Sequence, residues 1–332
     1  MSWKKPETKV SGTKIFIYGL EGTRKTRTAL TFPKLAYIDT DQGADDYISE
    51  FQDNIEMLSD ATTFTEVNDN LDDIGEFLDQ IETIVLDTDT KVYENQQHTA
   101  MRVAENRAKK NNRLAEGEGL SPKEWGIINM NHDKMLHKLF EYKKDGKIII
   151  CVAEAKEQKE SFQDNSGNTH FRTVGYMPNT AKGIKYDFDI ILEMVKDEKT
   201  GKFKGAKVHK DRTGTIEEGE IVENPSYEIW KDAIERKKQG NVKEAKRNME
   251  EDIDRDMKSF DFSDVEKIDQ LKSDIDEVIN SISQDEDGAK LKSEIGKKFK
   301  EILQTTNNYK QIDDVKLLQR CLDSAKEIAN VE

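Results

Sequence analysis

The sequence predicts an α/β fold with a mostly parallel sheet, followed by a small bundle of α-helices. Three observations support this prediction. Short apolar runs alternate with helix-compatible segments up to about residue 235, which is typical of a parallel sheet covered on both faces. A glycine-containing loop joins the first apolar run to a helix-compatible stretch. Beyond residue 260, apolar residues recur at helical spacing between short polar breaks.

The first part of the chain predicts three buried strands and two helices. The expected strands are 14–18, 35–39 and 83–87, which are almost wholly apolar runs. The expected helices are 25–32 and 64–80, the second with an apolar face made by Val67, Leu71, Ile74 and Leu78.

The following segments alternate between polar and apolar. The polar stretches are 91–123, which is expected to be partly helical, and 154–185; between them, 125–142 has helical periodicity. Further strands are expected at 147–153, 186–194 and 206–209. We therefore predict an α/β domain over 1–235, a charged helical linker over 236–260 and an acidic helical domain over 261–332.

The composition is acidic and highly charged. Charged residues make up 36% of the chain and the net charge is −15, so any DNA contact requires local basic patches. Cys151 and Cys321 lack the spacing of a disulfide scaffold or a zinc site and suit a reducing cytoplasm. No signal peptide is apparent, and no run approaches the ~20 apolar residues of a membrane helix. We expect a soluble intracellular protein with no membrane partner.

Residues 19–26 read Gly-Leu-Glu-Gly-Thr-Arg-Lys-Thr and match the phosphate-loop pattern G-x-x-x-x-G-K-[ST] except at Arg24. In such a loop Lys25 reaches the β- and γ-phosphates of ATP and Thr26 holds Mg²⁺. If the last glycine position requires a positive φ, Arg24 costs about 1–3 kcal/mol of strain. The candidate nucleotide-binding residues are Gly19, Glu21, Gly22, Thr23, Arg24, Lys25, Thr26 and Arg27. The alternative is an ordinary strand–turn–helix with basic residues.

Two carboxylates follow other predicted strands. Asp87 ends the strand 83–87, where it is expected to orient Mg²⁺ together with Thr26. Asp41 follows the strand 35–39 and is expected at the same edge of the sheet, where it would polarise the attacking water. Each aspartate has the alternative role of a turn or helix-cap residue.

Together these segments resemble the RecA-like P-loop ATPases encoded by phages, which group with AAA-type phage nucleotide-binding proteins and single-strand annealing recombinases. The resemblance runs from about Thr13 to Arg212. It rests on Lys-Ile-Phe-Ile-Tyr-Gly-Leu-Glu-Gly-Thr-Arg-Lys-Thr (14–26), Tyr-Ile-Asp-Thr-Asp-Gln-Gly (37–43), Thr-Ile-Val-Leu-Asp-Thr (83–88), Ile-Ile-Ile-Cys-Val-Ala-Glu-Ala-Lys (148–156) and His-Lys-Asp-Arg (209–212).

The resemblance implies catalytic roles for four residues. Asp41 falls where relatives usually have a catalytic Glu, and its shorter side chain implies weaker activation of water. Glu154 falls where relatives have a Gln or His that senses the γ-phosphate, although a carboxylate there repels the nucleotide. Lys210 and Arg212 resemble a cationic pair that reaches the γ-phosphate of a neighbouring subunit. Their alternative is a pair of exposed charges on an edge strand.

The resemblance also implies that two polar stretches grip single-stranded DNA. The first contains Arg102, Arg107, Lys109, Lys110 and Arg113. The second contains Lys156, Lys159, Phe162, His170, Phe171, Arg172, Lys182 and Lys185, where cations follow phosphates and aromatic rings stack on bases. The alternatives are a solvated helix face for the first stretch and a flexible surface loop for the second.

The expected protein is therefore an ATP- and Mg²⁺-dependent, single-stranded-DNA-binding recombination ATPase that acts as a homo-oligomeric ring or filament in the cytoplasm of a bacterial host. A catalytically weak P-loop DNA-binding protein and a small-molecule P-loop kinase are the alternatives. Residues 241–332 hold 23 acidic and 16 basic side chains, which makes this segment a poor DNA binder. It is expected to dock a partner such as a single-stranded-DNA-binding protein, or to serve as a self-association or capping bundle.

Overall fold

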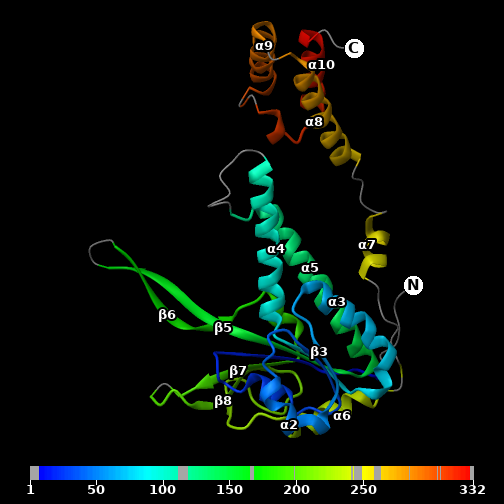
Figure 1. Ribbon diagram of the computed structural model, residues 1–332, viewed down its shortest axis with the longest axis vertical. Coiled ribbons are helices and arrows are strands. Elements are labelled where there is room, and N and C mark those ends of the chain that lie inside the picture. Colours follow the sequence, from blue (N-terminus) through cyan, green and yellow to red (C-terminus); the bar gives the residue numbers. More distant parts are fainter. Residues whose placement is uncertain are drawn as a thin grey trace. The chain divides into compact units, whose positions relative to one another are not determined.

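The structure is a computed structural model that describes residues 7–110, 119–164, 168–197, 199–240, 242, 249–257, 263–283, 285–304, 306 and 308–329. The chain divides into two compact units, Met1–Met249 and Glu250–Glu332. Figure 1 shows a sheet with helices in the first unit and a group of helices in the second. The predicted α/β class, with C-terminal helices, is confirmed.

The first unit is built on a nine-stranded sheet with the order β3-β2-β4-β5-β1-β7-β8-β9, and β6 pairs with β5 beside this path. The strands are β1 (Lys14–Gly19), β2 (Leu35–Asp39), β3 (Ile55–Asp60), β4 (Thr83–Asp87), β5 (Ile148–Gln163), β6 (Thr169–Pro178), β7 (Ile190–Lys196), β8 (Phe203–Asp211) and β9 (Ile221–Val222). The six strands from β3 to β7 along this order pair in parallel, whereas β6, β8 and β9 pair antiparallel. The carboxyl ends of the parallel strands therefore meet at one edge.

Helices cover both faces of this sheet. They are α1 (Lys25–Ala29), α2 (Ile48–Phe51), α3 (Phe64–Asp73), α4 (Asp89–Lys110), α5 (Pro122–Glu141) and α6 (Tyr227–Lys238). Side chains of β1 alternate between two cores: Phe16 packs in the cluster that includes α3 and α5, and Ile17 packs in the cluster that includes α1 and Trp230 of α6. Burial on both sides explains why the central strands are apolar throughout.

Several predicted elements differ in length. The helix expected over 25–32 ends at Ala29, and that expected over 64–80 ends at Asp73 and continues as a 3₁₀ helix to Gln80. The strand β3 was not predicted, because its sequence Ile-Glu-Met-Leu-Ser-Asp lies on the edge of the sheet and is mostly exposed.

The polar stretch 154–185 contains a β-ribbon. β5 continues past the expected end at 153, and its second half pairs with β6 from Ala155–Pro178 to Gln163–Thr169. The first six residues of β5 are buried within the sheet, and most of the remaining residues are exposed. In Figure 1 the ribbon extends from the body of the sheet. The alternative of a flexible loop is wrong for its described residues, because cross-strand pairing orders them.

The charged helical linker expected over 236–260 is not one continuous helix. α6 ends at Lys238, and α7 spans Met249–Met257. Between them, Val242 accepts a hydrogen bond from Val10 N, while a Cβ on Gly240 would overlap the backbone of Lys9 and Val10. This close approach of two backbone segments requires glycine and prevents the helix from continuing.

The second unit is a small helical bundle. Besides most of α7, this unit contains α8 (Ser263–Ser281), α9 (Glu286–Leu303) and α10 (Val315–Ala329), as the three apolar stripes predict. The core includes Ile275 of α8, Phe299 of α9 and Leu318 of α10, each of which is buried. This unit therefore has a hydrophobic core of its own.

Candidate functional site

The candidate site lies at the carboxyl edge of the parallel sheet. Parallel pairing places Gly19 of β1 beside Glu154 of β5, and Asp39 of β2 beside Asp87 of β4. The loop 20–24 connects β1 to α1 at this edge. The sheet therefore brings together the phosphate loop and the carboxylates that lie far from it in the sequence.

The loop has the positive φ angles that its glycine pattern predicts, including at Arg24. Gly22 has φ 66°, and Arg24, the N-cap of α1, has φ 65° and ψ 27°. A left-handed conformation at a residue with a Cβ costs about 1–2 kcal/mol. The guanidinium of Arg24 lies over the ring of Phe203, 5.0 Å from its centroid, and this contact offsets part of the cost. A Cβ on Gly19 would lie 2.7 Å from Met194 O, so glycine is required there as well.

Lys25 is the first residue of α1, and the charges of four acidic residues act on it. Its Nζ donates to Leu20 O at 3.1 Å, and Thr23 Oγ1 donates to the same oxygen at 2.6 Å. Burial lowers the pKa of Lys25 below its usual value, and the charges of Asp87, Glu154, Asp41 and Glu21 oppose this shift. The ammonium thus lies in a pocket of negative potential within the phosphate loop.

Asp87 accepts two hydrogen bonds on one carboxylate oxygen. Thr26 Oγ1 donates to Oδ2 at 2.7 Å, and Tyr37 OH donates to the same atom at 2.5 Å. The other oxygen, Oδ1, is buried and has no hydrogen-bond partner. Burial raises the pKa of Asp87 to about 6, against the effect of these two hydrogen bonds.

These groups fit a Mg²⁺ ion. A buried carboxylate oxygen without a partner and an adjacent threonine hydroxyl are hard oxygen ligands of the type that Mg²⁺ uses beside nucleotide phosphates. Within the described residues there is no cluster of three or more His, Cys, Asp or Glu that could hold a metal ion. An ion held by Thr26 and Asp87 would therefore take its other ligands from phosphate and water.

Two aspartates after β2 have different environments. Asp39 is buried and accepts hydrogen bonds from the backbone N–H groups of Asp41, Gly43 and Ala44, so it fixes the loop. Asp41 is exposed, and its Oδ1 accepts from Gly43 N at 3.0 Å. Desolvation and the charge of Asp39 raise the pKa of Asp41. Asp41 is thus the accessible carboxylate of the two.

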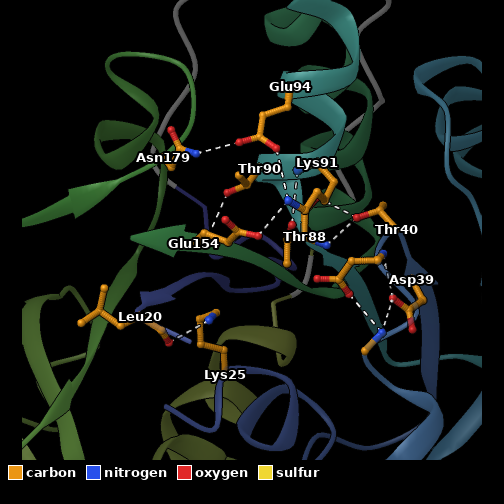
Figure 2. A network of polar contacts seen from close by, with 12 residues as sticks. Leu20, Lys25, Asp39, Thr40, Thr88, Thr90, Lys91, Glu94, Glu154 and Asn179 are labelled. Carbon is orange, nitrogen blue, oxygen red and sulfur yellow. Dashed lines mark hydrogen bonds and ion pairs between the residues drawn. The ribbon is translucent and has the colours of Figure 1, made fainter. Parts of the chain in front are cut away.

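Glu154 is paired with a lysine. Its Oε1 lies 3.1 Å from Lys91 Nζ at the start of α4, and Figure 2 shows this ion pair. The repulsion of phosphate that the sequence predicts at this position is therefore reduced, because the carboxylate is neutralised by an adjacent ammonium.

A known protein family matches the part of the chain that contains the sheet and the phosphate loop. Residues 11–222, which include β1 to β9, match the family model described as AAA domain. The chain belongs to this AAA domain family. Its sheet, phosphate loop and paired Thr26 and Asp87 are those of a P-loop ATPase domain. The helical unit from residue 250 lies outside the matched region.

Two solved structures are similar to the chain, at low identity. The flagellar accessory protein FlaH from Methanocaldococcus jannaschii has 14% identity and a TM-score of 0.33, with 65% of this chain and 84% of that chain covered. A prototypical ATPase from the type III secretion system of pathogenic bacteria has 10% identity and a TM-score of 0.38, with 96% and 81% covered. No curated protein matches the chain.

Three other predicted site residues, Arg27, Lys210 and Arg212, form contacts with protein groups outside the phosphate loop. Arg27 forms a bidentate ion pair with Glu50. Lys210 Nζ donates to Tyr186 O at 3.1 Å, and Arg212 Nη1 lies 3.9 Å from Asp189 Oδ1. Because β8 is antiparallel to β7, Lys210 and Arg212 lie at the opposite edge of the sheet from the loop.

The predicted DNA-contact residues are distributed over α4 and the ribbon. On α4, Arg102 and Lys109 are exposed, and Arg107 lies 3.1 Å from Glu124. Lys110 ends this helix, its side chain is not described, and Arg113 lies outside the described residues.

The ribbon has exposed aromatic residues beside a cation. The exposed fractions of Phe162 and Phe171 are 44% and 69%. Arg172 forms an ion pair with Glu160, and its guanidinium lies 5.9 Å from the ring centroid of Phe162.

Sequence reasoning missed three residues that shape the site. Tyr37 interrupts an apolar strand, and a buried tyrosine hydroxyl signals a polar partner, which here is Asp87. Lys91 has no such signal, because only the fold places it beside Glu154. Lys196 ends β7, and its Nζ would lie 3.8 Å from a Cβ on Gly22, so a further cation borders the loop.

Proposed function

We propose that this protein is an ATP-dependent, single-stranded-DNA-binding recombination protein of phage type, which promotes annealing or strand pairing. It acts in the bacterial cytoplasm as a homo-oligomeric ring or filament and hydrolyses ATP at subunit interfaces. The observation that best supports nucleotide chemistry is the pairing of Thr26 with Asp87, whose second oxygen is buried without a partner.

The roles of the site residues follow from their positions. Lys25 and the backbone N–H groups of the loop bind the phosphates, and Thr26 and Asp87 hold Mg²⁺. Bound Mg²⁺ neutralises charge that develops on the phosphates. Asp41, the accessible carboxylate at this edge, orients and polarises the attacking water.

The proposed DNA contacts are made by α4 and the ribbon. Single-stranded DNA is bound by cations that follow its backbone and by aromatic rings that stack on its bases. Arg102 and Lys109 on α4, and Phe162, Phe171 and Arg172 on the ribbon, supply both kinds of group on exposed surfaces. Local basic residues are needed because the net charge of the chain is −15.

The proposed oligomer gives Lys210 and Arg212 a role. Both lie at the sheet edge opposite the phosphate loop, so they serve a nucleotide only across a subunit interface. The acidic helical unit is proposed to dock a protein partner such as a single-stranded-DNA-binding protein, since its charge disfavours DNA.

The deciding experiment measures phosphate release with and without single-stranded DNA, together with ATP affinity. The wild-type chain is expected to release phosphate faster with DNA, and Lys25→Ala is expected to lose ATP binding. Unchanged ATP affinity in Lys25→Ala contradicts the assignment of the loop. The side chain of Asp41, which is one methylene shorter than the glutamate that the resemblance implies, favours a second candidate, a P-loop protein that binds DNA with little turnover. DNA binding without phosphate release supports that candidate.

A further inference from the structure

A cavity lies between three helices of the first unit, and no residue of the phosphate loop lines it. Its volume is about 560 Å³, and its lining comes from the segment 62–65 at the start of α3 and from parts of α4 and α5. Val67 of α3, Val92 of α4 and Met135 of α5 belong to one hydrophobic core, so the three helices cover the same face of the sheet (Figure 1). Small-molecule sites have volumes of about 300–1,000 Å³, so this cavity has the size of a ligand site.

Much of the cavity wall is apolar. Phe64 of α3, Val103 of α4 and Ile128 of α5 each contribute to it. The exposed fractions of Val103 and Ile127, which also lines the cavity, are 51% and 45%, so apolar surface is open to a ligand. Such a wall fits the faces of a planar ring, and the aromatic ring of Phe64 is of the type that stacks on bases.

Gln96 adds a polar group to this wall. The exposed fraction of Gln96 is 8%, and both Oε1 and Nε2 are buried without a hydrogen-bond partner among the described residues. A buried amide that lacks partners is costly, because it has lost its hydrogen bonds to water. A ligand that places a donor and an acceptor side by side would supply both missing hydrogen bonds.

An adenine base meets these requirements. Its N6 amino group donates and its N7 accepts, and a glutamine side chain pairs with both atoms at once. An apolar side chain of a protein partner would fill the cavity but leave the amide of Gln96 unpaired. Arg107 also lines the cavity, 57% exposed and 3.1 Å from Glu124, and a guanidinium has further N–H groups for a phosphate attached to the base.

We infer that this cavity binds an adenine base, of single-stranded DNA or of a free nucleotide, through the side-chain amide of Gln96. For DNA, the inference rests on the proposed function. Binding turns the amide of Gln96 into the cavity, where Oε1 accepts from N6 and Nε2 donates to N7. Phe64 and Ile128 contact the ring, and Arg107 contacts the adjacent phosphate. The site is separate from the phosphate loop and gives the chain a preference for adenine.

The first arm of the test measures the affinity of the full chain for labelled dA and dT oligonucleotides of equal length, by fluorescence anisotropy without ATP. The wild type is expected to bind the dA strand more tightly, and Gln96→Leu is expected to lower the dA-to-dT affinity ratio about tenfold. The matched control is Gln97→Leu, which changes the neighbouring glutamine outside the cavity lining and is expected to keep the wild-type ratio.

The second arm measures binding of adenosine monophosphate by titration calorimetry in Lys25→Ala, so that the phosphate loop does not contribute. Adding Gln96→Leu to this variant is expected to weaken binding about tenfold. A loss in either arm supports the inference and identifies the source of the base, and unchanged affinities in both arms overturn it. A wild-type chain that binds neither oligonucleotide contradicts the DNA binding of the proposed function, and the second arm still decides the inference.

Two further measurements separate the contact from a loss of folding. Gln96→Leu removes no hydrogen bond printed for the described residues, so its urea unfolding midpoint is expected to be at or above that of the wild type. Ala100→Trp places an indole at the cavity wall and is expected to abolish the adenine preference while the chain still unfolds cooperatively in urea. An adenine preference that persists in folded Ala100→Trp overturns the placement of the base in this cavity.

Discussion

Arg24 and Tyr37 are residue types that their positions in the sequence do not favour: Arg24 replaces a glycine of the loop pattern, and Tyr37 brings a hydroxyl into a buried strand. Arg24 stands where the pattern has glycine and adopts the left-handed conformation that glycine favours, with its guanidinium over Phe203. The loop geometry is therefore retained at the cost of local strain. Tyr37 is buried in an apolar strand because its hydroxyl reaches Asp87, so a polar atom in the core serves the candidate site.

The hydroxyl of Tyr37 is expected to orient Asp87. Tyr37→Phe should lower the free energy of unfolding by about 1–3 kcal/mol, because a buried carboxylate loses a donor. It should also weaken Mg²⁺-dependent nucleotide binding, measured by calorimetry. Tyr142→Phe is the control: it removes a hydroxyl that donates to Leu71 O away from the site. It should lower stability and leave nucleotide affinity unchanged, and equal affinity losses in both variants would contradict the role.

At the scale of elements, Asp189 links β1 to Lys143 and to α6 at the amino edge of the sheet. Its Oδ2 accepts from Lys14 N at 3.0 Å and from Lys143 Nζ at 2.9 Å, and Lys237 of α6 lies 3.8 Å away. Burial by itself raises the pKa of Asp189, but these hydrogen bonds and the lysine charges lower it overall.

This lowered pKa predicts a pH-dependent stability. The contribution of Asp189 is complete above the unfolded pKa near 3.9 and is lost as the pH falls through the lower folded value. Asp189→Asn should therefore lower the free energy of unfolding by about 2 kcal/mol at pH 7. Urea unfolding at a series of pH values should show this difference shrinking below about pH 4. A difference that is constant with pH would refute the assignment.

The ribbon is the element whose function is most directly testable. Phe171→Ala should weaken binding of single-stranded DNA by about 1–3 kcal/mol if its exposed ring stacks on a base. Tyr186→Ala is the matched control, because this tyrosine is 84% exposed and lies outside the ribbon. Fluorescence anisotropy with a labelled oligonucleotide gives both affinities. Equal affinity in Phe171→Ala and the wild type would exclude this stacking contact.

At the scale of the whole molecule, the two edges of the sheet separate the parts of the proposed active site. The phosphate loop lies at the carboxyl edge, and Lys210 and Arg212 lie at the other. In the proposed function, an active site is therefore completed only where two subunits meet. Within the described residues, no helix is long and apolar enough to cross a membrane.

Mixed oligomers of two inactive variants test whether the phosphate loop of one subunit works with Lys210 and Arg212 of another. Lys25→Ala and the double variant Lys210→Ala/Arg212→Ala should each be inactive alone. Random mixed oligomers should regain phosphate release at about a quarter of their interfaces, where an intact loop faces an intact cationic pair. Full inactivity of the mixture, with oligomers confirmed by light scattering, would argue against action across the interface.

The sequence by itself determined the α/β class, the central strands and the phosphate loop. Continuous apolar runs bury the central strands wherever they pair, and the loop pattern is local, so neither depends on distant contacts. Only the tertiary structure decided that β5 and β6 form a ribbon, that Tyr37 reaches Asp87, and that Lys91 pairs with Glu154. The contacts of Tyr37 and Lys91 join residues far apart in the chain, and the order and register of the strands set them. The ribbon pairs nearby residues, but most of these are exposed, so no alternation of apolar residues indicates it in the sequence.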